Sequence, residues 1–111
     1  MKTHEQRLQE LLAKDKTHPK DMERKAMFYI LSGNDDLYSK VHHIYDFQEN
    51  SIKSECLESD NVDLSSSARR LINLAFNLYN GLPADVSDTF YLLDEDNSQL
   101  AIEAIKLRFK F

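Results

Sequence analysis

The sequence is poor in residues that break or cross-link a chain. Its 111 residues include two glycines, two prolines, one cysteine and no tryptophan. Since tight hairpins depend on glycine and proline, this scarcity favours helices. Cys56 has no partner for an internal disulfide and fits a reducing compartment. There is no run of eighteen apolar residues, and the first residues lack the apolar stretch of a signal peptide. We therefore expect one cytoplasmic domain, residues 1–111, with no membrane contact.

Charge is unevenly distributed along the chain, around a net value of −5. Residues 35–64 carry eight acidic and two basic side chains, whereas residues 1–34 carry five acidic and seven basic ones. An acidic middle third disfavours contact with phosphates, so we do not expect a nucleic-acid partner. The excess charge is typical of a surface that keeps a small protein soluble.

Residues 65–80 give the strongest helical pattern. Serines precede the apolar run and Asn80-Gly81 follows it, which is the usual chemistry of a helix start and end. The apolar positions cover most of the helix circumference, which is typical of a buried central helix. The side chains expected to be almost fully buried are Leu71, Leu74, Ala75 and Leu78. We predict an all-α single compact domain of five or six helices packed around this central helix.

Cap and spacing signals predict the other helices. The first expected helix covers residues 4–14, after a capping box of Thr3 and Gln6. The second starts at Thr17-His18-Pro19, with Pro19 in its first turn, and ends at Gly33. The others run from Asn34 to about Glu49, over 87–93, and onward from a cap within Asp94–Asn97. Gly33 is expected just beyond the second helix, as its C′ residue. Residues 52–62 lack periodicity and predict a loop, mobile inside the chain, with one turn near Cys56-Leu57.

The start of the central helix is the polar feature with the most chemical content. It combines hydroxyl and guanidinium groups from Ser65, Ser66, Ser67, Arg69 and Arg70. Together with the unpaired N–H groups of a helix N-terminus, these groups suit an anion or a phosphate. The alternative is simple capping by serine, with the arginines paired to acids of residues 55–63.

A line of asparagines follows on the same helix. Asn73, Asn77 and Asn80 share a face with Arg70. A water-facing line would more often hold lysine and glutamate, which have higher helix propensity. We predict that Asn73 or Asn77 is buried and bonded to main-chain groups of residues 52–62 or of the last helix. Otherwise the line is a binding face.

His42, His43 and Asp46 are the remaining candidate binding residues. On one helix, His42 and Asp46 have the i,i+4 spacing of two metal ligands, and His18 or Glu49 would have to complete the set. Because the sequence offers no second ligand pair, a solvent-facing histidine beside a carboxylate is the simpler interpretation. We predict no metal and no cofactor.

Three further motifs fail on the residues that they require. A helix-turn-helix aligned on Gly33 places Tyr29 where a small residue is needed and puts aspartates at the start of the recognition helix. A calcium loop starting at Asp94 has Gln99 where glycine is required. Acids near Cys56 would raise the pKa of its thiol, which disfavours a nucleophilic dyad. No catalytic residue is predicted, and whether the chain is an enzyme stays open.

Several short stretches occur together in this chain. They are Thr17-His18-Pro19, Glu23-Arg24, Phe28-Tyr29-Ile30, Gly33-Asn34-Asp35-Asp36-Leu37-Tyr38, His43-Ile44-Tyr45-Asp46-Phe47, Ser65-Ser66-Ser67, Phe76-Asn77-Leu78-Tyr79-Asn80-Gly81 and Ala101-Ile102-Glu103-Ala104-Ile105-Lys106-Leu107-Arg108-Phe109. This combination, from about His18 to Phe109, resembles a family of short bacterial and prophage proteins of unknown function. The resemblance implies a small cytoplasmic protein, with a mobile element as one source, and supplies no activity.

Two functional hypotheses follow. The first is a non-enzymatic protein that acts by binding another protein, with a second copy of the chain as one candidate partner. The alternative is a small-anion or phosphate-binding protein, or a weak enzyme, that uses the Ser65–Arg70 helix end with His42 or His43. A concave polar pocket at Ser65–Arg70 would favour the alternative. A flat apolar patch with a twofold contact would favour the first hypothesis.

Overall fold

Helices make up most of the protein in a computed structural model that describes residues 2–58 and 62–110. The elements are α1 (His4–Asp15), α2 (Met22–Gly33), α3 (Asp35–Ser39), the 3-10 helix η1 (Val41–His43), β1 (Tyr45–Asp46), β2 (Ser51–Ile52), the 3-10 helix η2 (Ser54–Leu57), α4 (Ser66–Asn80), α5 (Val86–Tyr91) and α6 (Glu95–Phe109). The two strands form one small antiparallel sheet. The predicted all-α class is therefore confirmed. None of the helices in the described residues is long and apolar enough to span a membrane.

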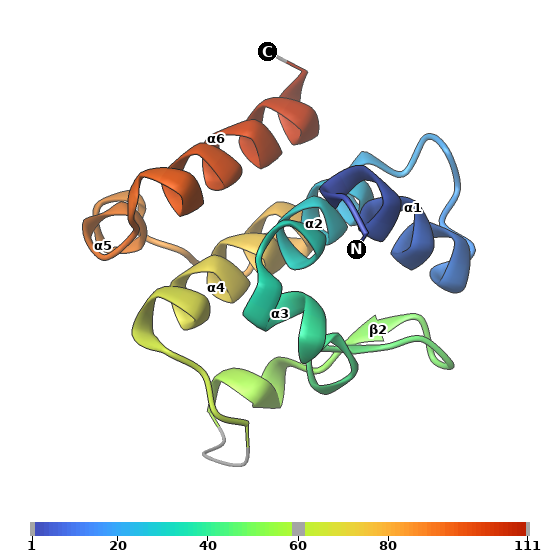
Figure 1. Cartoon of the computed structure of the whole chain (residues 1–111), viewed down its shortest axis with the longest axis horizontal. Coiled ribbons are helices and arrows are strands. Elements are labelled where there is room, and N and C mark those ends of the chain that lie inside the picture. The colour runs from blue at the N-terminus through green and yellow to red at the C-terminus, as the bar shows by residue number, and fades with distance from the viewer. Residues whose placement is uncertain (1, 59–61, 111) are drawn as a thin grey trace.

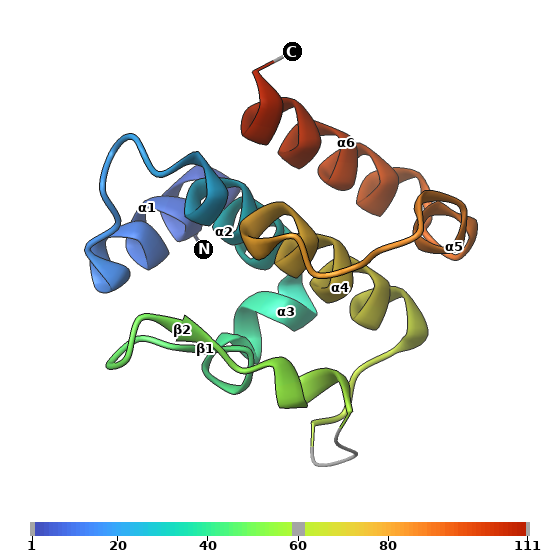
Figure 2. The same ribbon diagram turned by 180° about the vertical axis from the view of Figure 1, so that it is seen from behind.

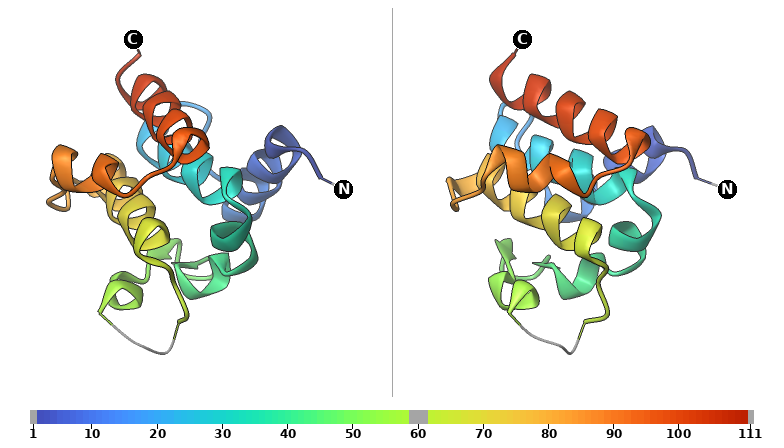
Figure 3. Two further views of the ribbon diagram at one scale, coloured as in Figure 1. Left: turned by 60° about the vertical axis from the view of Figure 1, so that its left-hand side comes forward. Right: turned by 90° about the vertical axis from the view of Figure 1, so that its left-hand side faces the viewer.

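α2 and α4 lie side by side in the middle of the molecule. α6 packs on one side of this pair, and α3, the hairpin and η2 lie on the other (Figure 1, Figure 3). α1 packs against α2, and α5 packs against α4. The four residues expected to be buried in α4, Leu71, Leu74, Ala75 and Leu78, are all buried. α2 shares the central place with α4, since it contacts α1, α4 and α6.

Several helix ends lie where local cap chemistry predicts them. Four of the expected N-caps accept a hydrogen bond from the backbone N–H three residues later: Thr3, Asn34, Ser65 and Asp94. Gly81 has a positive φ of 81° and ends α4 in the left-handed conformation. These signals act within a few residues of chain, so distant packing does not override them.

The second helix begins later than predicted. The Asp21 side chain caps α2, accepting from the Arg24 backbone N–H (2.9 Å) and from the Arg24 guanidinium (3.0 Å). The Thr17 hydroxyl instead donates to Asp15 (2.5 Å), so it does not cap a helix. The prediction that Pro19 lies in the first turn of this helix was therefore wrong.

Gly33 has a different role from the one predicted. It is the last residue of α2 rather than the residue beyond it, and Asn34 follows with extended backbone (φ −122°). A Cβ atom on Gly33 would lie 2.4 Å from Leu100 Cδ1 and 2.9 Å from the ring of His4. A side chain at position 33 would therefore displace Leu100 and His4, so glycine lets these side chains of α6 and α1 lie close against α2.

The third helix is much shorter than predicted. The prediction of a helix to about Glu49 was wrong, because the chain leaves α3 for η1 and then the hairpin. Tyr45 pairs with Ile52 across the hairpin. Asp46 Oδ1 accepts from the backbone N–H groups of Gln48 (2.9 Å) and Glu49 (3.1 Å), which starts the turn. β-Branched and aromatic residues fit a strand as well as a helix, so spacing alone does not separate the two.

The segment before α4 contains the expected single turn. η2 covers Cys56-Leu57, and Cys56 is buried in the core. Of the predicted loop 52–62, residues 59–61 lie outside the described residues. The predicted mobility of this loop stays a prediction.

Candidate functional site

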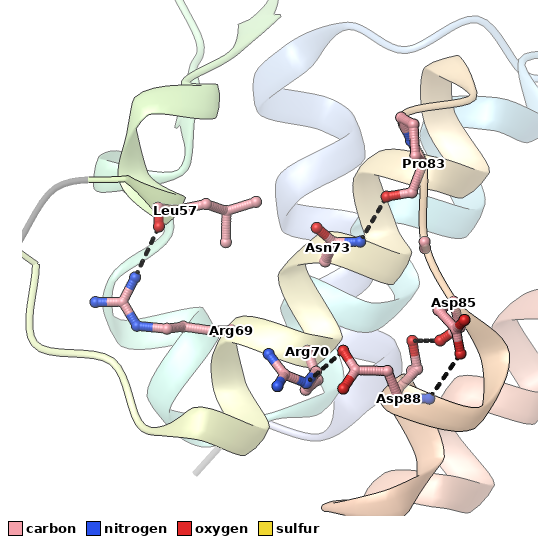
Figure 4. Close-up of a pocket in the computed structure, with 9 residues that line it drawn as sticks. Leu57, Arg69, Arg70, Asn73, Pro83, Asp85 and Asp88 are labelled. Carbon is pink, nitrogen blue, oxygen red and sulfur yellow. Dashed lines mark hydrogen bonds and ion pairs between the residues drawn. The ribbon is translucent and has the colours of Figure 1, made fainter.

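A hollow of about 560 Å³ opens between α4 and the chain that leads into α5 (Figure 4). Arg69, Arg70 and Asn73 of α4 line one side, Asp85 and Asp88 line the other, and Leu57 of η2 lies at one end. Three of the predicted binding residues, all from α4, therefore share one concave polar surface.

Ser65 caps α4, and Ser65, Ser66 and Ser67 do not line this hollow. Ser65 Oγ accepts from the backbone N–H of Ala68 (3.1 Å) and lies 3.2 Å from Ser67 Oγ. Ser65 and Ser66 are exposed, and Ser67 is half-buried. The capping alternative thus describes these hydroxyls without a ligand.

The two arginines have different partners. Arg69 Nη1 donates to the Leu57 carbonyl (3.1 Å), so within the described residues it bonds to the main chain of residues 55–63 and not, as was predicted, to one of their acids. Arg70 Nε lies 3.0 Å from Asp88 Oδ2, although its N–H does not form an aligned hydrogen bond. Asp85 caps α5 by accepting from the Asp88 backbone N–H (2.9 Å). With two guanidinium and two carboxylate groups, the hollow attracts a free anion less than unpaired arginines would.

The asparagines hold the linker between α4 and α5. Asn73 Nδ2 donates to the Pro83 carbonyl (3.0 Å), and Asn77 Nδ2 donates to the Leu82 carbonyl (2.8 Å). Asn80 Oδ1 accepts from the Leu82 backbone N–H (3.0 Å). The predicted main-chain bonding is confirmed. The predicted burial was wrong, because Asn73 and Asn77 are half-buried. Their main-chain partners belong to the linker between α4 and α5, not to residues 52–62 or to α6. These bonds fix the wall of the hollow.

His42, His43 and Asp46 do not share a helix, so the predicted i,i+4 arrangement was wrong. Both histidines lie in η1 and Asp46 lies in β1, since α3 ends before these residues. His42 Nε2 lies 3.2 Å from Lys14 Nζ, and its ring is 5.8 Å from the ring of Phe47. In the part of the chain that the structure describes, no group of three or more His, Cys, Asp or Glu side chains could hold a metal ion.

A buried polar cluster at the end of α1 was not predicted from the sequence. Asp15 is 4% exposed. It accepts from the Tyr45 hydroxyl (2.5 Å), the Thr17 hydroxyl (2.5 Å) and the Asn50 amide (2.8 Å), and lies 3.6 Å from Arg24 Nε. Burial raises the pKa of the Tyr45 hydroxyl above its ordinary value. We call these five residues the Asp15 cluster; its internal bonding assigns it to stability.

One signal in the sequence could have found this cluster. Asp15 follows Leu8 and Leu11 at helical spacing, on the buried stripe of α1. A charged residue on such a stripe needs polar partners from elsewhere in the chain. The sequence does not say which residues supply them.

α5 and α6 expose large apolar side chains. Tyr91 is 86% exposed, Val86 72% and Leu92 44%. The other two exposed large apolar residues in the described part of the chain are Ile102 and Phe109 of α6. α5 projects at an edge of the molecule, next to the linker that the asparagines hold (Figure 2). The sequence of residues 87–93 predicts this short helix but not its exposure.

Fold and surface together define a small all-α protein in which a short helix with exposed apolar side chains lies beside a charged hollow. Comparison with protein-family models matches residues 1–111 to the "Family of unknown function (DUF6075)". The chain belongs to this family, which confirms membership of an uncharacterised family. Searches of curated proteins and of solved structures gave no match. Function is therefore inferred from the geometry of this chain.

Proposed function

We propose that the protein acts without catalysis, by binding another protein through the surface of Val86, Tyr91 and Leu92, the α5 surface. The high exposure of these three side chains carries the proposal. Fully burying a large apolar side chain stabilises a protein or a complex by about 1.5–3 kcal/mol. Because these side chains stay exposed after folding, most of that stabilisation remains available for binding a partner. Large apolar side chains that are exposed beside polar groups are common at protein-binding surfaces.

The hollow extends this surface on one side. Asp85 and Asp88 line the hollow, and Leu92 follows them at i+7 and i+4, which places the three residues on one face of the helical segment. A partner segment on this face would cover Leu92 and reach the polar groups of the hollow together. Such a combination of apolar anchor and polar rim is common in interfaces.

We also propose a bacterial cytoplasm as the place of action, with a prophage as one source of the protein. Support comes from the sequence resemblance described above and from Cys56, which is a free, buried thiol. Burial raises the pKa of this thiol to about 11, so it stays protonated and unreactive near neutral pH.

A photo-crosslinking amino acid at position 91 tests the proposal in cells. We expect a covalent adduct with another protein from position 91 and none from position 20, the site of exposed Lys20 in the loop on the far side of the molecule. An adduct whose mass is twice that of the chain would identify a second copy as the partner. Equal adducts from both positions, or none from position 91, would exclude α5 as the docking surface.

Binding of a small anion or phosphate in the hollow, with or without weak catalysis, is a second candidate. The observation that favours it is the shared position of Arg69, Arg70 and Asn73. Titration with inorganic phosphate should shift the NMR amide signals of these residues in a saturable way. Replacement of both arginines by glutamine should abolish the shifts. Absence of saturation below about 10 mM would remove this candidate.

A further inference from the structure

We infer that the partner of the α5 surface presents a basic amphipathic segment, in which Lys or Arg side chains lie beside apolar ones. This inference rests on the proposed function. It follows from the charges around α5, because an apolar surface alone does not distinguish a basic partner from an acidic one.

The chain on either side of α5 has no cationic side chain, and the cations that face it are Arg69 and Arg70 of α4, across the hollow from Asp85 and Asp88. Between Leu71 and Ile105 the sequence contains no Lys, Arg or His, but it contains six acidic residues. Five of these acidic residues are exposed and lie within or next to α5: Asp85, Asp88, Asp94, Glu95 and Asp96. We call them the α5 carboxylates.

Most of these charges have no cationic partner in the described part of the chain. Asp88 pairs with Arg70 at 3.0 Å, and none of the other four forms an ion pair with a described residue. Asp85 and Asp94 each cap a helix with one carboxylate oxygen, which satisfies N–H groups but leaves the negative charge. Because Asp94 is two residues from Leu92, it lies within about 8 Å of it along the chain. The exposed apolar side chains therefore lie in a negative field.

This field selects among possible partners. A second copy docked by a twofold contact would bring the α5 carboxylates of both copies together, and like charges oppose such a contact. A nucleic acid or an anionic membrane is disfavoured for the same reason. A segment with Lys or Arg beside apolar side chains would bury Tyr91 and Leu92 and compensate the charge of the carboxylates. Long-range attraction would also speed its association.

Two synthetic amphipathic helices of about four turns serve as probes, one built from Leu and Lys and the other from Leu and Glu at identical apolar spacing. Calorimetry with the full chain at low and at physiological salt should show binding of the Leu/Lys peptide, weakened by salt, and none of the Leu/Glu peptide. Tyr91→Ser/Leu92→Ser should abolish this binding. Equal binding of both peptides, or no effect of this variant, would overturn the inference.

Charge variants distinguish attraction by the α5 carboxylates from attraction by the net charge of the whole protein. Glu95→Gln/Asp96→Asn should weaken Leu/Lys binding roughly 3- to 10-fold, since each exposed carboxylate contributes modestly. Glu5→Gln/Glu49→Gln removes the same charge from exposed sites away from α5 and should change affinity less than about twofold. An equal loss in both variants would mean attraction by net charge and overturn the inference. Glu95→Gln alone, with the Asp94 cap intact, repeats the test if the double variant folds poorly.

The two proposals can fail separately. If crosslinking at position 91 captures a partner whose contacting segment carries no Lys or Arg, the inference about charge is wrong and the docking surface stands. If position 91 captures nothing while the Leu/Lys peptide binds, the proposed function is wrong.

Discussion

The Asp15 cluster and the α5 surface use polar groups in opposite ways. In the Asp15 cluster a carboxylate that is 4% exposed accepts bonds from three side chains. On the α5 surface, carboxylates face water and large apolar side chains are exposed beside them. A buried polar group costs free energy unless it is bonded, so the first arrangement must be complete within the chain. The second is incomplete without a partner.

Two arginines show the same contrast. Arg24 donates to the Tyr45 hydroxyl (3.2 Å), the Asp21 carboxylate (3.0 Å) and the Asn50 carbonyl (2.9 Å). Its hydrogen bond to Tyr45 raises the pKa of the guanidinium further. Arg70 has one ion pair, with Asp88, at the edge of the hollow (Figure 4). An arginine with several fixed partners stabilises the fold, whereas one at an exposed pair keeps donors for a ligand.

The largest expected effect is in the Asp15 cluster. Asp15→Ala should lower the free energy of unfolding by about 3–5 kcal/mol, because Arg24 and the Tyr45 hydroxyl lose a buried partner. Urea denaturation measures the change. The matched control is Asp88→Ala, which removes an exposed ion-pair partner and should cost less than about 1 kcal/mol. Equal losses would show that the two regions do not differ as described.

The asparagine that anchors the linker should have an intermediate effect. Asn77→Leu leaves the Leu82 carbonyl without its donor and should destabilise by about 1–3 kcal/mol. Asn73→Leu should cost less, since the hydrogen bond of Asn73 is exposed. Thermal unfolding of both variants checks the order. If neither variant lowers the melting temperature, the asparagine line has no structural role and becomes a candidate binding face.

The pH dependence of stability tests the burial of Cys56. Burial, with a smaller contribution from Glu55, raises the pKa of the thiol from 9.0 to about 11, so the folded state holds this proton more tightly than the unfolded state. The contribution of this thiol to the free energy of unfolding is thus fully present below pH 9 and is lost as pH rises toward 11. The fall in stability between pH 9 and 11 should be smaller in Cys56→Ala, because this variant lacks the thiol and the other titrating groups are the same in both proteins. Identical pH profiles of the two proteins would contradict a buried thiol.

The smallest effect on stability is expected at the α5 surface. Tyr91→Ser and Leu92→Ser should each change the free energy of unfolding by less than about 0.5 kcal/mol, because these side chains are exposed in the folded chain. The same substitutions should remove partner binding. Calorimetric unfolding would reveal a larger loss, which would mean that these residues belong to the core.

The sequence by itself determined the all-α class, the burial of α4 and most helix ends. Thr3, Ser65 and Asp94 cap their helices by bonds that reach three residues along the chain, and Gly81 ends α4 through its own left-handed conformation. Such contacts are decided by the local chain, so local reasoning finds them. Family membership was also recognisable from short stretches of sequence.

Only the tertiary structure decided where α3 ends, what surrounds Asp15 and which side of α5 meets water. Tyr45 lies 30 residues from Asp15 along the chain, and their bond holds the hairpin against α1. Asn50 reaches Asp15 from 35 residues away. Partners so distant in sequence leave no local spacing to detect, and exposure of α5 depends on how α4 and α6 cover the rest of the core. The candidate binding surface is what this packing leaves uncovered.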